Sequence, residues 1–172
     1  MAKARPADDL ITHERLLELV SYDPESGIFT LKIRRRKYPV GHVLGTAHHT
    51  GYTLIKLDQI EYQASRLAVF YMTGIWPEHL ADHRNRRRSN NFWTNIRPAN
   101  FSQNRMNSIG GKNSGAKGVY LRKRKNWKPV WVAQIKEPFG KVIHLGHFPD
   151  RNSASKAYQA AAEKLFGEFA RS

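Results

Sequence analysis

The sequence predicts an α+β protein built from two domains. Segments rich in β-branched and aromatic residues recur along the 172-residue chain, at lengths typical of short antiparallel strands. Other stretches carry apolar residues at the spacing of an amphipathic helix. A polar, glycine-rich stretch divides the chain, which indicates a linker between two separately folded parts.

The first part contains the signals of short helices and strands. One helix is expected to begin at Thr12 and to bury Leu16, Leu17 and Val20. A second, buried helix is expected around residues 67–72, ended by Gly74. Strands are expected over residues 28–33, 51–57 and 59–64. Both element types therefore mix within this part.

The second part reads as a small sheet followed by a helix. The linker is placed at residues 107–116, and strands are expected at 117–124, 131–136 and 141–147. Asp150 and Ser153 are typical of a helix N-terminus. Apolar residues then fill every position of the amphipathic template: Ala154, Ala157, Tyr158, Ala161, Ala162, Leu165 and Phe166. Residues 117–172 are thus expected to form a three-stranded antiparallel sheet packed on one helix.

Positive charge is concentrated in the second half. The chain has 29 Lys and Arg against 14 Asp and Glu, a formal net charge of +15. Residues 1–80 hold 10 basic and 9 acidic side chains, residues 81–116 hold 7 and 1, and residues 117–172 hold 12 and 4. Such a field suits a phosphate backbone, because each neutralised phosphate releases counterions. We expect double-stranded DNA as the partner, with a solvated basic face as the alternative.

The composition excludes several classes of protein. With no cysteine, the chain has no disulfide, no Cys-ligated zinc or iron–sulfur site and no catalytic thiol. No apolar run reaches the ~18 to 20 residues that span a bilayer. The basic residues do not line one face of a long helix, so no membrane partner is expected. We expect a soluble protein of the cytoplasm, that of a bacterial host cell if the gene belongs to a phage.

One face of the predicted C-terminal sheet is polar. A sheet that packs on a helix leaves its other face exposed, and here alternation places basic, amide and aromatic side chains on that face. These residues are Tyr120, Arg122, Arg124, Gln134, Lys136 and His144. A β-sheet can enter the major groove, where Arg reads guanine and Gln reads adenine. The face therefore predicts DNA binding, with a solvated outer face as the alternative.

Four stretches of this segment occur together at a specific spacing. They are Gly118-Val119, Trp131-Val132-Ala133-Gln134-Ile135-Lys136, Leu145-Gly146-His147-Phe148, and Ala154 and Ala157-Tyr158 with Ala161-Ala162. The segment resembles the APETALA-type (ethylene-response-factor) DNA-binding domain, whose sheet lies in the major groove. Tyr120 replaces an arginine of the family and His144 a tryptophan, so the docking mode is expected to carry over and the base preference is not.

Asp82 and His83 begin a spaced set of polar residues. His83 lies 12 residues before Asn95, which lies 9 residues before Asn104. Phosphodiester hydrolysis needs an activated water and neutralised charge at phosphorus. An imidazole accepts a proton near pH 7, which suits the first of these needs. The alternative for an Asp-His pair is a surface turn without chemistry.

Further motifs surround this set. Asp82-His83 is followed by Asn90-Asn91-Phe92-Trp93-Thr94-Asn95-Ile96-Arg97 and by Ser102-Gln103-Asn104. It is preceded by Tyr22-Asp23-Pro24-Glu25-Ser26-Gly27-Ile28-Phe29, Ala64-Ser65-Arg66-Leu67-Ala68, and Thr73-Gly74 with Trp76-Pro77. Together these resemble the ββα-metal (His-Me finger) nucleases of the His-Asn-His (HNH) class, and most closely phage endonucleases of the homing type. Phage members with an APETALA-type module behind the nuclease are a known arrangement.

The resemblance implies a role for each matching residue. His83 would be the general base, and Asp82 and Asn104 would bind a divalent cation. Oxygen ligands suit Mg²⁺ or Mn²⁺. Asn95 would brace the loop and orient the His83 ring through a backbone hydrogen bond. The three arginines that follow the Asp-His pair would add phosphate contacts: Arg86, Arg87 and Arg88.

The function expected from both resemblances is that of a metal-dependent DNA endonuclease of the homing type, acting as a monomer. A nuclease domain over residues 1–106 would cut or nick the duplex, and the C-terminal sheet would select the site. The chain departs from the nuclease family at Ser65, commonly His, and at Arg84-Asn85-Arg86-Arg87, commonly Ile-Asn-Gly-Asp. These departures favour a second hypothesis, a non-catalytic DNA-binding protein with a degenerate nuclease domain. A basic RNA-binding protein, the third hypothesis, fits the charge but not the spacing.

Overall fold

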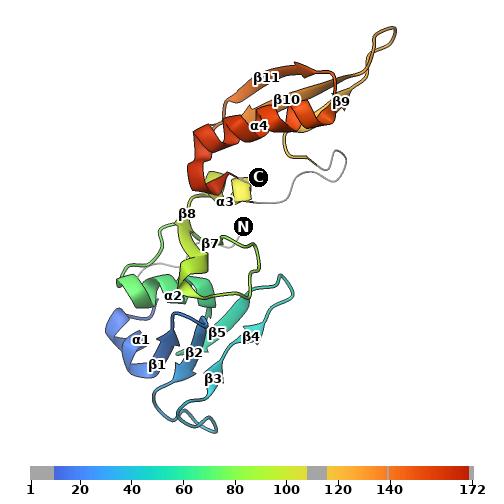
Figure 1. The fold of residues 1–172 in the computed structure, drawn as a ribbon. Coiled ribbons are helices and arrows are strands. Elements are labelled where there is room, and N and C mark those ends of the chain that lie inside the picture. The colour runs from blue at the N-terminus through green and yellow to red at the C-terminus, as the bar shows by residue number, and fades with distance from the viewer. Residues whose placement is uncertain (1–9, 108–115, 139, 171–172) are drawn as a thin grey trace. The chain divides into compact units, whose positions relative to one another are not determined.

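The computed structural model describes residues 10–107, 116–138 and 140–170 (Figure 1). The chain is α+β and divides into two compact units, Met1–Ala99 and Asn100–Ser172, which are described separately below. Within the described residues, every helix is too short or too polar to cross a membrane.

The first unit begins with a helix that leads directly into a sheet. Helix α1, His13–Leu19, is capped by Thr12, whose side chain accepts a hydrogen bond from the Arg15 backbone amide. The strands that follow pair antiparallel in the order β1-β2-β3 and are β1 (Val20–Asp23), β2 (Ile28–Leu31) and β3 (Val43–Leu44). The expected helical position of Val20 is wrong. Val20 is buried as the first residue of β1, opposite Leu31, so its apolar side chain reaches the core from a strand.

A second sheet and the longest helix of this unit complete its core. The sheet has the order β4-β5-β6, from β4 (Thr46–Ala47), β5 (Thr53–Leu57) and β6 (Ile60–Gln63). Helix α2, Ala64–Thr73, buries Leu67, Ala68 and Phe70. It ends at Gly74 as the sequence predicts, because that residue takes a left-handed conformation with φ 70°.

Two short strands close the first unit. Strand β7 (Leu80–His83) pairs antiparallel with β8 (Ile96–Ala99), which places Asp82 opposite Arg97 and His83 opposite Ile96. A turn of 3₁₀ helix, Trp93–Asn95, leads into β8. Figure 1 shows these strands following α2 and joined by a long loop, which holds the residues between Arg84 and Phe92.

The second unit is a sheet with one long helix along one face (Figure 1). Its three strands pair antiparallel in the order β11-β10-β9 and are β9 (Val119–Arg122), β10 (Val130–Lys136) and β11 (Val142–Phe148). Helix α4, Arg151–Phe166, begins at Asp150, whose carboxylate accepts a hydrogen bond from the Ser153 amide at 2.8 Å. A short 3₁₀ turn, Gly167–Phe169, follows it.

Small residues allow α4 to lie close to the sheet. Ala154 and Ala162 are fully buried, as the amphipathic spacing predicts. Gly118, just before β9, has φ +64°, and a Cβ there would lie 2.2 Å from the Tyr158 ring and 2.3 Å from the Gln134 carbonyl oxygen. No larger residue fits at this position without moving the helix or the sheet.

Helix α3, Phe101–Asn107, belongs to the second unit, whereas the sequence placed residues 1–106 together. Contacts with the C-terminal part explain this difference. The Lys117 ammonium donates to the Met106 carbonyl at 2.8 Å, and Ser102 donates to the Pro138 carbonyl at 3.3 Å. Apart from its ends, the expected linker at 107–116 lies outside the described residues.

Candidate functional site

Asp82 forms a buried ion pair at the end of β7. Its Oδ2 atom accepts a hydrogen bond from Arg97 Nε at 3.0 Å, and the two side chains are only 5% and 6% exposed. The pairing of β7 with β8 sets this contact, because the two residues are direct cross-strand partners. A buried carboxylate needs such a partner, since removing an ion from water is costly.

Asn91 fixes the tautomer of His83. The Nε2 atom of the imidazole lies 3.0 Å from Asn91 Oδ1. Asn91 Nδ2 donates to the Ser89 carbonyl at 3.1 Å, so the amide oxygen must face the ring. An amide oxygen only accepts, and Nε2 therefore carries the proton. In the neutral ring the lone pair then lies on Nδ1, which is the atom able to take a proton from water.

The surroundings of His83 favour its neutral form. Burial lowers the pKa of this imidazole below the ordinary value for histidine, and the positive charge of Arg88 lowers it further. The Asn91 hydrogen bond and the charge of Asp82 act in the opposite direction. The ring is thus uncharged at pH 7, as a general base requires.

Asn95 braces the loop between the two strands. Its Oδ1 atom accepts a hydrogen bond from the Asn85 amide at 2.9 Å, and its Nδ2 atom donates to the Asn90 carbonyl at 2.6 Å. Its backbone carbonyl accepts from the Arg84 amide at 2.8 Å, directly after β7. These contacts fix the loop both next to β7 and next to the 3₁₀ turn. The implied orientation of the His83 ring by the Asn95 backbone stays a prediction, whereas the ring contact with Asn91 was not anticipated from the sequence.

The turn after His83 keeps the conformation that a glycine would favour. Arg86 has φ 62°, in the left-handed region, and its amide donates to the His83 carbonyl at 2.8 Å. Arg86, which stands where the resembling nucleases commonly have glycine, therefore leaves a tight turn in place, at a conformational cost of about 1 kcal/mol. The predicted phosphate contacts Arg86, Arg87 and Arg88 are exposed on this loop.

The turn between β1 and β2 supports the far end of the loop. Tyr22 donates its hydroxyl proton to the Asn91 carbonyl at 2.6 Å, and the Trp93 amide donates to the Pro24 carbonyl at 2.8 Å. A Cβ on Gly27 would lie 2.2 Å from the Asn91 backbone, and φ there is +75°. This turn therefore positions Asn91, which in turn accepts a hydrogen bond from the His83 ring. The sequence identified the motif, but only the structure gives it this role.

The proposed cation ligands are oxygen atoms of Asp82 and Asn104. A carboxylate has about four lone-pair sites, so Asp82 can accept Arg97 and a cation together, and its hard oxygens suit Mg²⁺. Asn104 lies on α3 of the second unit, and its pairing with Asp82 stays a prediction. Across the described residues, no group of three or more His, Cys, Asp or Glu side chains could hold a metal. A cation at Asp82 would therefore take further ligands from water and phosphate.

Strand register places the predicted DNA-binding residues of the sheet. Tyr120 lies opposite Val132, and Gln134 lies opposite His144. Cross-strand partners share a face, and side chains alternate along each strand. The face away from α4 therefore carries Tyr120, Arg122, Gln134, Lys136 and His144, here called the polar face.

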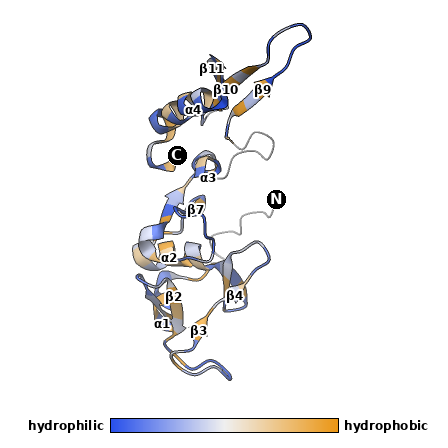
Figure 2. Ribbon diagram, turned by 45° about the vertical axis from the view of Figure 1, so that its right-hand side comes forward, coloured by the Kyte–Doolittle hydropathy of each residue, from blue (hydrophilic) through white to orange (hydrophobic). Residues whose placement is uncertain are grey.

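Arg124 does not lie on the sheet, although the sequence placed it on the first strand. Strand β9 ends at Arg122, and Arg124 begins a turn in which its carbonyl accepts from the Trp127 amide at 3.2 Å. Asn126 in this turn has φ 66°. Figure 2 shows the connection between β9 and β10 as a hydrophilic hairpin loop, which is where the charge of Arg124 lies.

A bulge adds His147 to the polar face. The register of β10 and β11 shifts at Ala133/Gln134, so that His147 pairs with Val132 while His144 pairs with Gln134. The His144 and His147 rings lie 4.8 Å apart between centroids, and Arg122 Nη2 contacts His147 Nε2. Alternation alone would have put His147 on the helix side. Gly146, with φ 132°, is the sequence signal, because glycine inside a strand often marks a bulge.

Two buried polar atoms lack a hydrogen-bond partner among the described residues: Ser65 Oγ and Arg122 Nε. Ser65 lies in the first turn of α2 and is 1% exposed. Arg122 lies on the polar face, although its Nε atom is itself buried. The unpartnered atom of Ser65 therefore lies within the core, whereas that of Arg122 belongs to a side chain of the sheet.

Comparisons with known proteins give no relative for this chain. No family model, no curated protein and no solved structure matches it.

Proposed function

We propose that this protein is a metal-dependent DNA endonuclease of the homing type, which nicks or cuts duplex DNA at a site selected by its C-terminal sheet. The observation that carries the proposal is the buried His83 imidazole, whose Nε2 atom is fixed by the Asn91 amide, next to the ion-paired carboxylate of Asp82. An exposed surface turn would leave Asp82 and His83 in solvent, whereas both are buried and each has a polar partner.

The residues of the first unit supply the proton chemistry. His83 Nδ1 takes the proton of the attacking water, and Asn91 keeps Nε2 protonated throughout. A Mg²⁺ or Mn²⁺ ion at Asp82 would neutralise charge on the phosphate and on the leaving 3′-oxygen. Arg97 holds the Asp82 carboxylate in place. The loop of Arg86, Arg87 and Arg88 contacts the backbone around the reacting phosphate.

The second unit supplies the duplex contact. Its polar face combines two side chains able to read base edges, Arg122 and Gln134, with the exposed cation Lys136.

The test is cleavage of supercoiled plasmid by the full chain. With Mg²⁺ or Mn²⁺ we expect nicked circles first, because one site cuts one strand at a time, and no product in EDTA. His83→Ala should abolish nicking, a loss of about 10²- to 10⁴-fold. His42→Ala, which removes a histidine that stacks on Tyr38 instead, is the matched control. Plasmid that stays supercoiled with both metals would refute the enzymatic proposal.

A second function is favoured by one observation at α2. Ser65 replaces the histidine common in the resembling family, and its buried hydroxyl has no partner among the described residues. If this change has removed activity, the protein is a sequence-specific DNA-binding protein with a degenerate nuclease domain. Metal-independent, salt-sensitive duplex binding without nicking would identify that case. Equal affinity for duplex RNA at matched salt would instead favour the RNA-binding alternative.

A further inference from the structure

We propose that Arg88 and Tyr52 form a phosphate-binding subsite beside His83, in which the Tyr52 ring and the Thr50 carbonyl hold the Arg88 guanidinium ready for a non-bridging oxygen of the DNA backbone. The subsite deepens the proposed nuclease function and rests on it for the identity of the substrate. Tyr52 lies just before β5, far from the Asp-His motif in sequence, and belongs to none of the motifs described above.

Three contacts define the subsite. The Arg88 Cζ atom lies 4.9 Å from the centroid of the Tyr52 ring, within the range of a cation–π interaction. Arg88 Nη1 donates to the Thr50 carbonyl at 2.8 Å. The Tyr52 ring in turn lies 6.0 Å, between centroids, from the His83 imidazole. The Tyr52 ring therefore contacts the Arg88 guanidinium and also lies near the His83 imidazole.

The loop before β5 is shaped to receive Arg88. The His48 amide donates to the Tyr52 carbonyl at 2.9 Å, and the Gly51 amide donates to the His48 carbonyl at 2.8 Å. Gly51 has φ +87°, and a Cβ built on it would stand 3.9 Å from two carbons of Arg88. The bend at Gly51 thus brings the Thr50 carbonyl to the guanidinium.

Arg88 differs from the arginines of this unit that pair with carboxylates, and it is more exposed than Arg66, which also donates to a backbone carbonyl, that of Pro77. Arg15 and Arg35 pair with Asp58, and Arg97 pairs with Asp82. Arg88 is held equally well, yet it has no ion pair with any residue that the structure describes, and it is exposed. A cation that is fixed in position but not neutralised is suited to an anion from outside. A guanidinium also has five N–H donors, so the Thr50 contact leaves the capacity to bind a phosphate.

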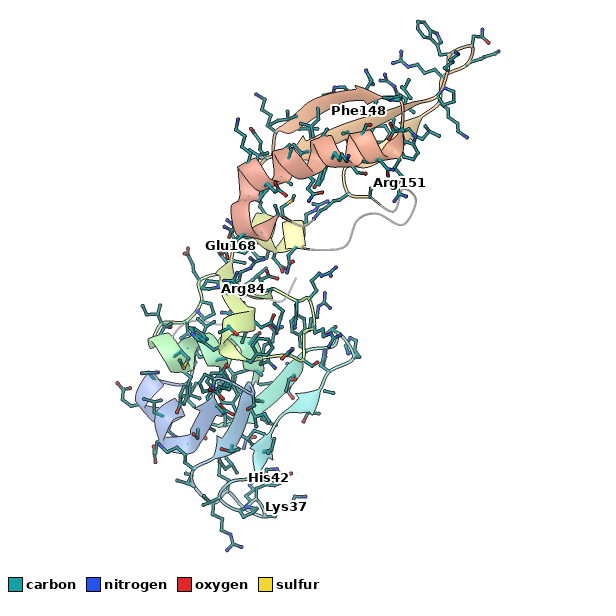
Figure 3. The ribbon with its side chains drawn as sticks, in the orientation of Figure 1. Lys37, His42, Arg84, Phe148, Arg151 and Glu168 are labelled. Carbon is teal, nitrogen blue, oxygen red and sulfur yellow. The ribbon has the colours of Figure 1, made fainter. Side chains whose placement is uncertain are left out.

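The test combines single-turnover nicking with duplex binding in EDTA, using the full chain. Arg88→Ala should slow nicking about 10²-fold, the usual loss for one preorganised donor to a reacting oxyanion. Tyr52→Leu should slow it about 2- to 5-fold, as expected for an exposed cation–π contact. Tyr52→Phe keeps the ring and should restore the rate. Two control variants, Lys37→Ala and Tyr38→Leu, disrupt the separate Lys37–Tyr38 pair near His42 (Figure 3). They should change neither the nicking rate nor the duplex affinity.

A double-variant cycle separates positioning from general damage. If Tyr52 acts through Arg88, Tyr52→Leu should have no further effect in the Arg88→Ala background. Equal losses in both backgrounds would show that the ring supports the fold instead, and would overturn the proposal. Should Tyr52→Leu fail to fold, Arg88→Lys decides: it should recover duplex affinity but not the rate, because an ammonium cannot both lie on the ring and present a planar fork. Full recovery of the rate would overturn the proposal.

The binding arm separates this inference from the nuclease proposal. If the wild type does not nick, the nuclease proposal is refuted. A weaker duplex affinity of Arg88→Ala in EDTA, relative to the Lys37→Ala control, would still support the phosphate-binding subsite. If the wild type nicks and Arg88→Ala alters neither rate nor affinity, the subsite is refuted and the nuclease stands.

Discussion

The two units use polar residues in opposite ways. In the first unit, the polar residues of interest are buried: Asp82, His83, Asn91, Asn95 and Arg97. Each is held by a hydrogen bond or ion pair. In the second unit, the basic and amide residues line an exposed sheet face, and the apolar residues are kept beneath α4. Buried pairing fixes atoms for chemistry, whereas an exposed face keeps side chains available to a large partner.

Arg97→Ala tests whether the first unit depends on its buried pairing. Removing this partner takes the counter-ion away from the buried Asp82 carboxylate, which should cost about 3–5 kcal/mol of stability. Urea unfolding combined with hydrogen exchange should locate the loss in residues 10–99. The double variant Asp82→Leu with Arg97→Met should recover much of it. A loss below about 1 kcal/mol would be typical of an exposed pair and would contradict the burial described.

Arg122→Ala makes the corresponding change on the polar face. We expect duplex binding to weaken by about 1–3 kcal/mol, with relaxed preference at one base pair, and stability to change little. Fluorescence anisotropy with a set of duplex sequences measures both effects. Lys164→Ala, an exposed cation of α4 on the other side of the sheet, is the control. If the two variants bind alike, the sheet is not the docking surface.

Ser65→Ala removes the orphan hydroxyl within the first unit. Because the Oγ atom is buried without a partner in the described structure, the variant should be more stable, by about 1 kcal/mol. Thermal unfolding at fixed pH measures this change. A clear loss of stability would indicate that the hydroxyl has a structural partner, such as a bound water.

Acidic pH should weaken the first unit slightly. Because burial lowers the pKa of His83, the unfolded chain binds a proton more readily than the folded one. This contribution to stability is complete above the ordinary histidine pKa of about 6.5 and declines as pH falls through the lowered folded-state value. Desolvation and the charges of Arg122, His144 and Arg124 also lower the pKa of His147, but that side chain is exposed.

Hydrogen exchange at pH 5 and pH 7 should therefore show the larger loss of protection in residues 10–99. His83→Gln should remove the difference between the two units. A loss that persists in this variant would assign the effect to other groups.

Local signals predicted much of the secondary structure. The Thr12 cap, the end of α2 at Gly74 and the start of α4 at Asp150 are confirmed, because capping and left-handed glycines act within a few residues. Strands β7 and β8 gave no periodic signal, since they bury the polar residues Asp82, His83 and Arg97 alongside apolar ones. Pairing within the site overrides the usual alternation there.

The sequence by itself determined the order of the motif residues, the amphipathic helix α4 and the concentration of positive charge. Tertiary structure alone decided that Asn91 sets the His83 tautomer, that Tyr52 supports Arg88, that His147 joins the polar face and that α3 belongs to the second unit. The physical reason is common to all four. Each depends on a contact between side chains or strands whose relative placement is set by packing and register, and periodicity along the chain does not encode which distant residues will meet.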